Sequence, residues 1–123
     1  MAESEALKAR VVKLDFDRRR VSWKRLARRL IFLERLMHID PLEIVIHRTK
    51  HGYHVRILLG REFSPLAIVA LQACLGSDYR REILNLERIV VGGRYANILF
   101  HNSERRLVFT GDWDKFLRWA RRR

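Results

Sequence analysis

The chain has 123 residues, of which 48% are hydrophobic and 33% are charged, so its composition is that of one folded domain and not of a disordered segment. Its 26 Lys and Arg against 14 Asp and Glu give a formal net charge of +12, which favours a polyanionic partner such as nucleic acid. The single cysteine, Cys74, excludes an internal disulfide and a multi-cysteine metal site, and its apolar surroundings predict a small core residue.

No apolar stretch approaches the length that spans a bilayer, and the first five residues include two glutamates and no basic residue, unlike a signal peptide. We therefore expect a soluble, cytoplasmic protein with no membrane partner. Residues 1–123 contain no linker or repeat, which predicts a single domain.

The first part of the chain predicts a strand followed by a helix. Residues 10–17 are rich in β-branched residues and alternate between apolar and polar ones, as a half-buried strand does. Ser22 can cap the helix that follows. The apolar residues of this helix recur at helical spacing and form one stripe: Leu26, Leu30, Leu33 and Met37.

Asp40-Pro41 ends this helix, and a hairpin follows. Its predicted strands cover residues 42–47 and 53–59, with a turn at 49–52. Ser64-Pro65 then opens a second helix, because serine is a preferred cap and proline fits the first helical position.

The last part of the chain begins where Gly76 ends the second helix and Ser77-Asp78 caps a further helical segment towards Glu87. Short strands are predicted at 89–91, 97–100 and 106–109, and Asp112 caps a final helix. The order predicts an α+β fold with an RRM-like βαββαβ core. We expect an antiparallel sheet with helices on one face, followed by a C-terminal hairpin and helix.

The carboxylates of Asp15 and Asp17 are two residues apart on a predicted strand, so they project from the same face. Adjacent carboxylates repel each other unless a cation or a guanidinium group compensates, and they are therefore candidate ligands of Mg²⁺ or Mn²⁺. If Val12, Leu14 and Phe16 face the helices, the matching apolar set on the second strand is Leu42, Ile44 and Ile46.

The opposite face of the predicted sheet then carries a polar set: Asp15, Asp17, Glu43, His47, His54 and Arg56. RRM-like sheets bind nucleic acid on this face. An antiparallel sheet with one solvated face is also polar there in the absence of any ligand, so both interpretations remain open.

These residues resemble the archaeo-eukaryotic primase superfamily, of archaeal or mobile-element type. The resemblance rests on Leu14-Asp15-Phe16-Asp17 at a strand end, followed by a helix, a strand and Lys50-His51-Gly52-Tyr53-His54-Val55. Members have an RRM-like catalytic core, a first motif Asp-x-Asp and a second motif with histidine after a small-residue turn. The resemblance implies that Asp15 and Asp17 hold Mg²⁺ or Mn²⁺ and that His54 contacts the phosphates of a nucleoside triphosphate.

The segment 75–88 resembles the third motif of that family, in which an acid is followed by a basic residue. Asn85 stands where the acid is expected, and its neutral amide is a weaker Mg²⁺ ligand than a carboxylate. Glu87 or Asp78 are alternative carboxylates, and Arg56 or Arg88 would join His54 in holding the triphosphate. The chain has about the length of the RRM-like half alone, whereas polymerising members carry an additional subdomain.

The resemblance implies a nucleotidyltransferase of DNA replication that acts on a DNA template by two-metal phosphoryl transfer. The alternative is a non-catalytic, basic DNA-binding accessory or regulatory protein, with a partner subunit or a second copy supplying missing parts. In both cases phosphates would be contacted by the same basic residues: Arg18, Arg19, Arg20, Lys24, Arg28, Arg121, Arg122 and Arg123. Tyr95, Phe100 or Trp119 would stack on bases.

A third hypothesis is a rolling-circle replication nuclease, which needs two histidines at i and i+2 and a catalytic tyrosine. His51 and His54 are three residues apart and therefore point to opposite faces of a strand. Tyr79 lacks the expected lysine partner, so this hypothesis has less support from the sequence than the other two.

Overall fold

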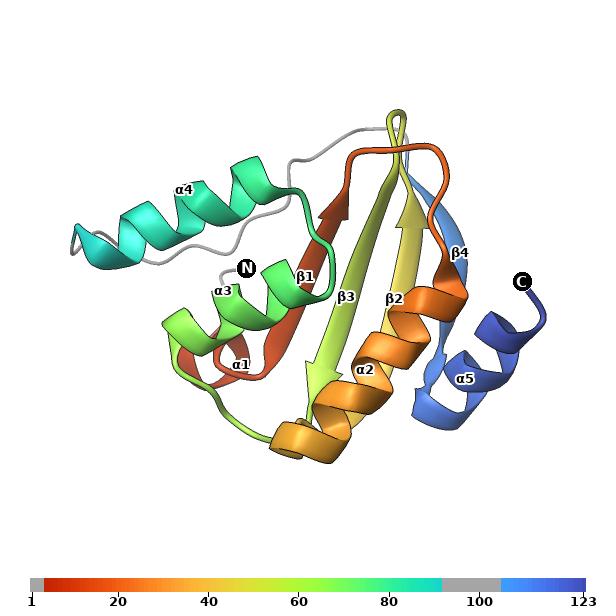
Figure 1. Cartoon of the computed structure of the whole chain (residues 1–123), viewed down its shortest axis with the longest axis horizontal. Helices are drawn as coiled ribbons and strands as arrows, with labels where there is room; N and C mark the ends of the chain where they lie inside the picture. Colours follow the sequence, from red (N-terminus) through yellow and green to blue (C-terminus); the bar gives the residue numbers. More distant parts are fainter. Residues whose placement is uncertain (1–3, 92–104) are drawn as a thin grey trace.

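Four antiparallel strands in the order β1-β3-β2-β4 form the sheet of the computed structural model, which describes residues 4–91 and 105–123 (Figure 1). The elements in chain order are α1 (Glu5–Lys8), β1 (Val11–Phe16), α2 (Trp23–Met37), β2 (Pro41–Arg48), β3 (Tyr53–Leu59), α3 (Pro65–Cys74), α4 (Tyr79–Val90), β4 (Arg106–Asp112) and α5 (Trp113–Arg121). Helices α2, α3 and α5 lie on one face of the sheet (Figure 1). The predicted α+β class, antiparallel sheet and C-terminal helix are confirmed.

The four longer helices α2, α3, α4 and α5 each begin at a serine or aspartate whose side chain accepts a hydrogen bond from a backbone N–H of the first turn. These caps are Ser22, Ser64, Asp78 and Asp112, as the sequence predicts. The strand predicted at 89–91 is wrong, because α4 continues through Val90. The strand predicted at 97–100 and the first arm of the C-terminal hairpin lie outside the described residues.

The strand register places the predicted apolar set against the helices. Leu14 pairs with Val55, which pairs with Ile46 on its other side, and all three side chains are fully buried. The stripe on α2 covers this layer, since Leu26, Leu30 and Leu33 are buried and Met37 packs at its edge. Helix α5 closes the other end of the core with Phe116 and Ala120.

Two predictions about single apolar positions are wrong. Leu42 is 40% exposed, because the register between β2 and β3 shifts between Pro41 and Glu43 and turns Leu42 out of the core. Cys74 is also exposed, because the buried side of α3 follows Ile68, Leu71 and then Leu75, and position 74 falls outside that stripe.

Strand β1 is an edge of the sheet, and helices α3 and α4 bind its outward-facing backbone groups. The Lys13 N–H donates to Gln72 Oε1 over 2.9 Å, and the Lys13 carbonyl accepts from Arg81 Nη1 over 2.8 Å. Two residues further on, the Asp15 N–H donates to Ser77 Oγ over 3.0 Å, and the Asp15 carbonyl accepts from the Asp78 N–H over 2.6 Å. These bonds take the place of a neighbouring strand and prevent edge-to-edge pairing at this position.

A buried polar cluster, formed by Gln72, Ser77, Arg81, Glu82 and Asn85, carries these contacts. The Glu82 carboxylate lies at its centre and accepts hydrogen bonds from Gln72 Nε2 over 2.6 Å, Ser77 Oγ over 2.7 Å and Asn85 Nδ2 over 3.2 Å. It also forms an ion pair with the Arg81 guanidinium. The cluster therefore fixes the positions of α3 and α4 relative to the end of β1 that carries Asp15.

None of the helices within the described residues has the length and apolar composition required to cross a bilayer.

Candidate nucleic-acid interface

The register places three predicted polar residues in one row across the face of the sheet opposite α2. Asp15 pairs with His54 on β3, and His54 pairs with His47 on β2. Asp15 Oδ1 lies 3.5 Å from His54 Nε2, which makes an ion pair whenever the imidazole is protonated. Both side chains are largely shielded, with 16% and 6% exposure respectively. The expectation that Asp15 and His54 share this face is confirmed.

The two histidines of this row have different surroundings. The guanidinium of Arg105 lies 3.5 Å from His47 Nδ1, and because guanidinium only donates, this nitrogen is the acceptor of a neutral ring. The pKa of His47 is lowered below its ordinary value of 6.5. Burial is the largest cause, followed by the positive charge of Arg105 and then by His54. Within the described residues, the buried Nδ1 of His54 has no hydrogen-bond partner.

A pocket of about 180 Å³ lies at the end of β1. Three carboxylate residues line it: Asp15 in β1, Asp17 just after it, and Asp78 at the cap of α4. Within the described residues, however, no three His, Cys, Asp or Glu side chains converge closely enough to hold a metal ion. The pocket brings the predicted aspartates together without a ready-made metal site.

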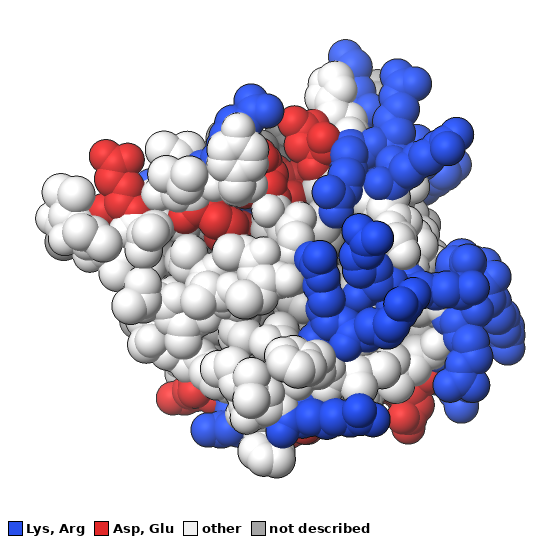
Figure 2. All heavy atoms as spheres, in the orientation of Figure 1, with Lys and Arg blue, Asp and Glu red and all other residues white. Residues whose placement is uncertain are grey.

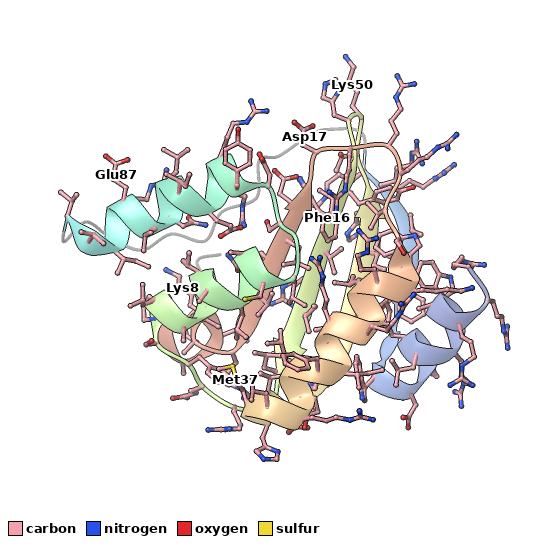
Figure 3. All side chains as sticks on the ribbon, in the orientation of Figure 1. Lys8, Phe16, Asp17, Met37, Lys50 and Glu87 are labelled. Carbon is pink, nitrogen blue, oxygen red and sulfur yellow. The ribbon has the colours of Figure 1, made fainter. Side chains whose placement is uncertain are left out.

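Three other residues assigned by the primase resemblance, Asn85, Glu87 and Arg88, do not line this pocket. Asn85, predicted as a metal ligand, is buried in the polar cluster beside Glu82 and does not line the pocket. Glu87 and Arg88 lie on the exposed side of α4, roughly 15 Å along the helix from its cap. In Figure 3, Glu87 and Asp17 lie far apart, whereas Asp17 lies at the same end of the molecule as Lys50.

Two further predicted site residues lie on the hairpin. Arg56 lies on the same face of β3 as His54, and its strand partners are Lys13 of β1 and Val45 of β2. His51 lies in the exposed turn between β2 and β3, so it does not share the strand face of His54. The histidine geometry required of a rolling-circle nuclease is therefore not formed by His51 and His54.

Basic side chains gather on the opposite side of the molecule from α4 (Figure 2). We call this the basic surface; it comprises the exposed residues Arg18, Arg19, Arg20, Lys24, Arg25, Arg28, Arg29, Arg121, Arg122 and Arg123. The first seven follow β1 and cover the start of α2, and the last three are the final residue of α5 and the two residues after it. The predicted nucleic-acid-binding residues thus come together on one surface, from parts of the sequence that are about 100 positions apart.

Helices α2 and α5 are held side by side by aromatic packing beneath the basic surface. The ring of Trp23, at the start of α2, lies 5.4 Å from the ring of Trp119 on α5. Arg123 stacks over Trp119, with its guanidinium 4.6 Å from the ring centroid. Trp119 is thus partly buried, and its ring is already packed against Trp23 and Arg123. The other two predicted stacking residues, Tyr95 and Phe100, lie outside the described residues.

A second pocket, of about 460 Å³, opens within the basic surface, and we call it the arginine pocket. Its cationic lining consists of Arg18, Arg20, Arg25 and Arg29, and its apolar lining includes Phe16 and Leu75. Arg29 also donates to the Cys74 carbonyl over 3.3 Å, which ties its guanidinium to the end of α3. Among the described residues, no carboxylate forms an ion pair with these four arginines.

Arg25 and Arg29 line the arginine pocket, but the sequence did not single them out from the other basic residues of the first helix. They lie one helical turn apart on α2, on the side that faces the C-terminal end of α3, so they share the wall of one pocket. The signal in the sequence is their spacing of four. It does not distinguish them from Lys24 and Arg28, which have the same spacing, because the position of α3 is not visible in the sequence.

Comparison with known proteins identifies no relative: no protein-family model matches the sequence, no curated protein matches it, and no solved structure matches the fold. The resemblance to primases therefore rests on the sequence motifs alone.

Proposed function

We propose that the protein binds nucleic acid through the basic surface, with a backbone phosphate held in the arginine pocket. The observation that carries this proposal is that four arginine residues line one pocket of about 460 Å³. Arginine suits such a site, because its planar group donates two parallel hydrogen bonds to phosphate. The formal net charge of +12 adds long-range attraction for a polyanion.

The position of the arginine pocket supports a phosphate as its occupant. The pocket lies beside the start of α2, where Ser22 caps the helix and the first turn contains no acidic residue. The free N–H groups at a helix start carry partial positive charge and favour an anion. Two basic residues of that first turn, Lys24 and Arg25, add full positive charges to the same region.

The apolar lining of the arginine pocket also fits a nucleotide better than a bare anion. Phe16, Val21 and Leu75 line the pocket together with the arginines. A sugar or base can contact these groups while its phosphate is held by the guanidinium groups, as in sites that bind single strands. We therefore propose single-stranded nucleic acid as the preferred ligand.

The proposal is tested by fluorescence anisotropy with labelled single-stranded DNA, the same sequence as RNA, and the corresponding duplex. We expect Arg25→Ala/Arg29→Ala to weaken binding of the single strand at least tenfold, because both residues line the arginine pocket. The matched control is Arg35→Ala/Lys115→Ala, which removes two exposed positive charges outside that pocket. Equal weakening by the two variants would contradict a specific pocket, and no binding of any nucleic acid would contradict the proposal as a whole.

A second candidate function is metal-dependent nucleotidyl transfer on a DNA template. It is favoured by the pocket that Asp15, Asp17 and Asp78 share, and by the contact between Asp15 and His54. Oxygen donors of this kind fit Mg²⁺ or Mn²⁺. A bound divalent ion would supply neutralisation of phosphate charge, and the substrate would be a nucleoside triphosphate.

The two candidate functions predict different results for Asp15→Asn/Asp17→Asn. Under nucleotidyl transfer, Mn²⁺-dependent incorporation on a primed template is abolished in this variant while DNA binding remains. Under binding alone, the wild type incorporates no nucleotide with either metal, and the variant binds DNA as well as or better than the wild type, because two negative charges next to a basic surface are removed.

A further inference from the structure

Helix α4 buries its polar side and exposes its apolar side, whereas an amphipathic helix usually buries its apolar side. Arg81, Glu82 and Asn85 face β1 and α3 and are at most 5% exposed, whereas the apolar side of the helix faces outwards. Four exposed residues lie along one line of the helix and form an apolar stripe: Tyr79 (67%), Ile83 (56%), Leu86 (38%) and Val90 (73%). Leu84 and Val91 are also exposed, but they lie outside this stripe, beyond its flank. Exposed contiguous apolar surface of this kind marks an interaction site.

The spacing of the apolar stripe is that of a helix that pairs with another helix. The steps from Tyr79 to Ile83, Leu86 and Val90 are four, three and four residues, which is the alternation of core positions in a coiled coil. At 100° per residue the four side chains fall within about 60° of one another, so they present a single narrow seam. In Figure 2 the surface over α3 is largely uncharged, and charged groups of both signs stand among the uncharged ones at α4.

The charges beside the seam identify the partner. Arg80 and Glu87 are exposed and flank the seam on the side opposite the buried polar cluster. Figure 3 shows Glu87 on the side of α4 away from α3. They are one heptad apart and opposite in charge. When two copies of α4 lie antiparallel, Arg80 of each copy falls beside Glu87 of the other, which gives two reciprocal ion pairs.

The same antiparallel arrangement matches the apolar residues. Tyr79 of one copy then packs against Val90 of the other, and Ile83 packs against Leu86, so the interface is closed by a twofold axis. In a parallel pair the two copies of this flank would lie on opposite sides of the seam, so Arg80 of one copy would not meet Glu87 of the other and neither ion pair would form. Charge complementarity therefore selects the antiparallel pair.

We infer that the protein forms a homodimer through antiparallel pairing of α4 with α4 of a second copy. The inference does not depend on nucleic-acid binding. It leaves both basic surfaces accessible, because these lie on the far side of the molecule from α4 (Figure 2).

Mass measurements by light scattering over a concentration series, without nucleic acid, test the inference. The wild type should rise from 14.8 kDa towards twice that mass. Ile83→Lys should remain at the monomer mass over the same range, because it places a charge in the seam. The matched control, Phe32→Lys, changes a 62% exposed apolar residue on α2 and should dimerise as the wild type does. A wild type that stays monomeric throughout would overturn the inference in favour of a different partner for the seam.

A charge-exchange experiment tests the antiparallel geometry and does not depend on how well Ile83→Lys folds. Arg80→Glu and Glu87→Arg should each dimerise at a concentration at least tenfold above that of the wild type, because each variant opposes like charges at both pairs. An equimolar mixture of the two should form the dimer at the wild-type concentration, because every pair in that heterodimer is Glu with Arg. A mixture that associates no better than either variant alone would overturn the antiparallel pairing.

Discussion

Replacing Glu82 with alanine should destabilise the fold by about 3–5 kcal/mol, which is the cost of removing one partner from a buried ion pair. Glu82 is 4% exposed, and Arg81, its ion-pair partner, is 5% exposed. The carboxylate also accepts hydrogen bonds from Gln72, Ser77 and Asn85. These contributions are not additive, since all five residues form one cluster.

The size of this effect can be compared with the stability of a domain of this length. A typical domain is stable by about 5–15 kcal/mol, so Glu82→Ala should remove a large part of that margin. With a urea m-value of about 2 kcal/mol/M, a loss of 3 kcal/mol lowers the denaturation midpoint by about 1.5 M. Trp23, which is buried in the core, provides the fluorescence signal.

The matched control is Glu87→Ala, which removes the same side chain from the exposed side of the same helix. It should change the stability of the monomer by no more than about 0.5 kcal/mol. Glu82→Gln keeps the shape of the side chain and removes its charge, so it should fall between the two. Midpoints of Glu82→Ala and Glu87→Ala that coincide would refute the assignment of a structural role to the polar cluster.

Three single positions give smaller effects that can be measured separately. Burial and Arg105 lower the pKa of His47, so the unfolded chain takes up a proton before the folded protein does. The stability should therefore decrease as the pH falls below about 6.5, and the urea midpoint of His47→Gln should decrease less over the same range. A Cβ at position 52 would lie 1.7 Å from the Phe16 carbonyl oxygen, so Gly52→Ala should cost about 1–3 kcal/mol, and an unchanged melting temperature would contradict this packing. Ser22→Ala removes the cap of α2 and should cost about 1 kcal/mol in the same thermal assay, whereas an exposed serine without a capping bond would cost nothing measurable.

Local patterns in the sequence predicted most of the fold because they act over a few residues. The spacing of the apolar residues predicted α2, and the Ser64-Pro65 pair predicted the start of α3. The alternation of apolar and polar residues predicted which side chains of β1 and β3 face the core. The strand predicted at 89–91 failed for a related reason: Val90 is β-branched, but it also continues the helical spacing of α4.

The order of the strands in the sheet and the docking of the helices could not be predicted from local sequence patterns. Alternation in β4 shows which residues face the core, but it does not show that β4 pairs with β2 and leaves β1 at the edge. Asn85 fitted a motif position, yet its burial depends on the way α4 docks against β1. For the same reason the sequence suggested a metal ligand where the structure has a member of the polar cluster.

The salt dependence of single-stranded DNA binding tests the central claim most directly. Removing one phosphate-binding side chain should reduce the slope of log K against log salt concentration by about 0.7 for a single strand, because fewer counterions are released. We predict that Arg25→Ala/Arg29→Ala lowers the slope by about 1.4, and that Arg35→Ala/Lys115→Ala leaves it unchanged. A slope near zero for the wild type, or the same slope for both variants, would contradict phosphate binding in the arginine pocket.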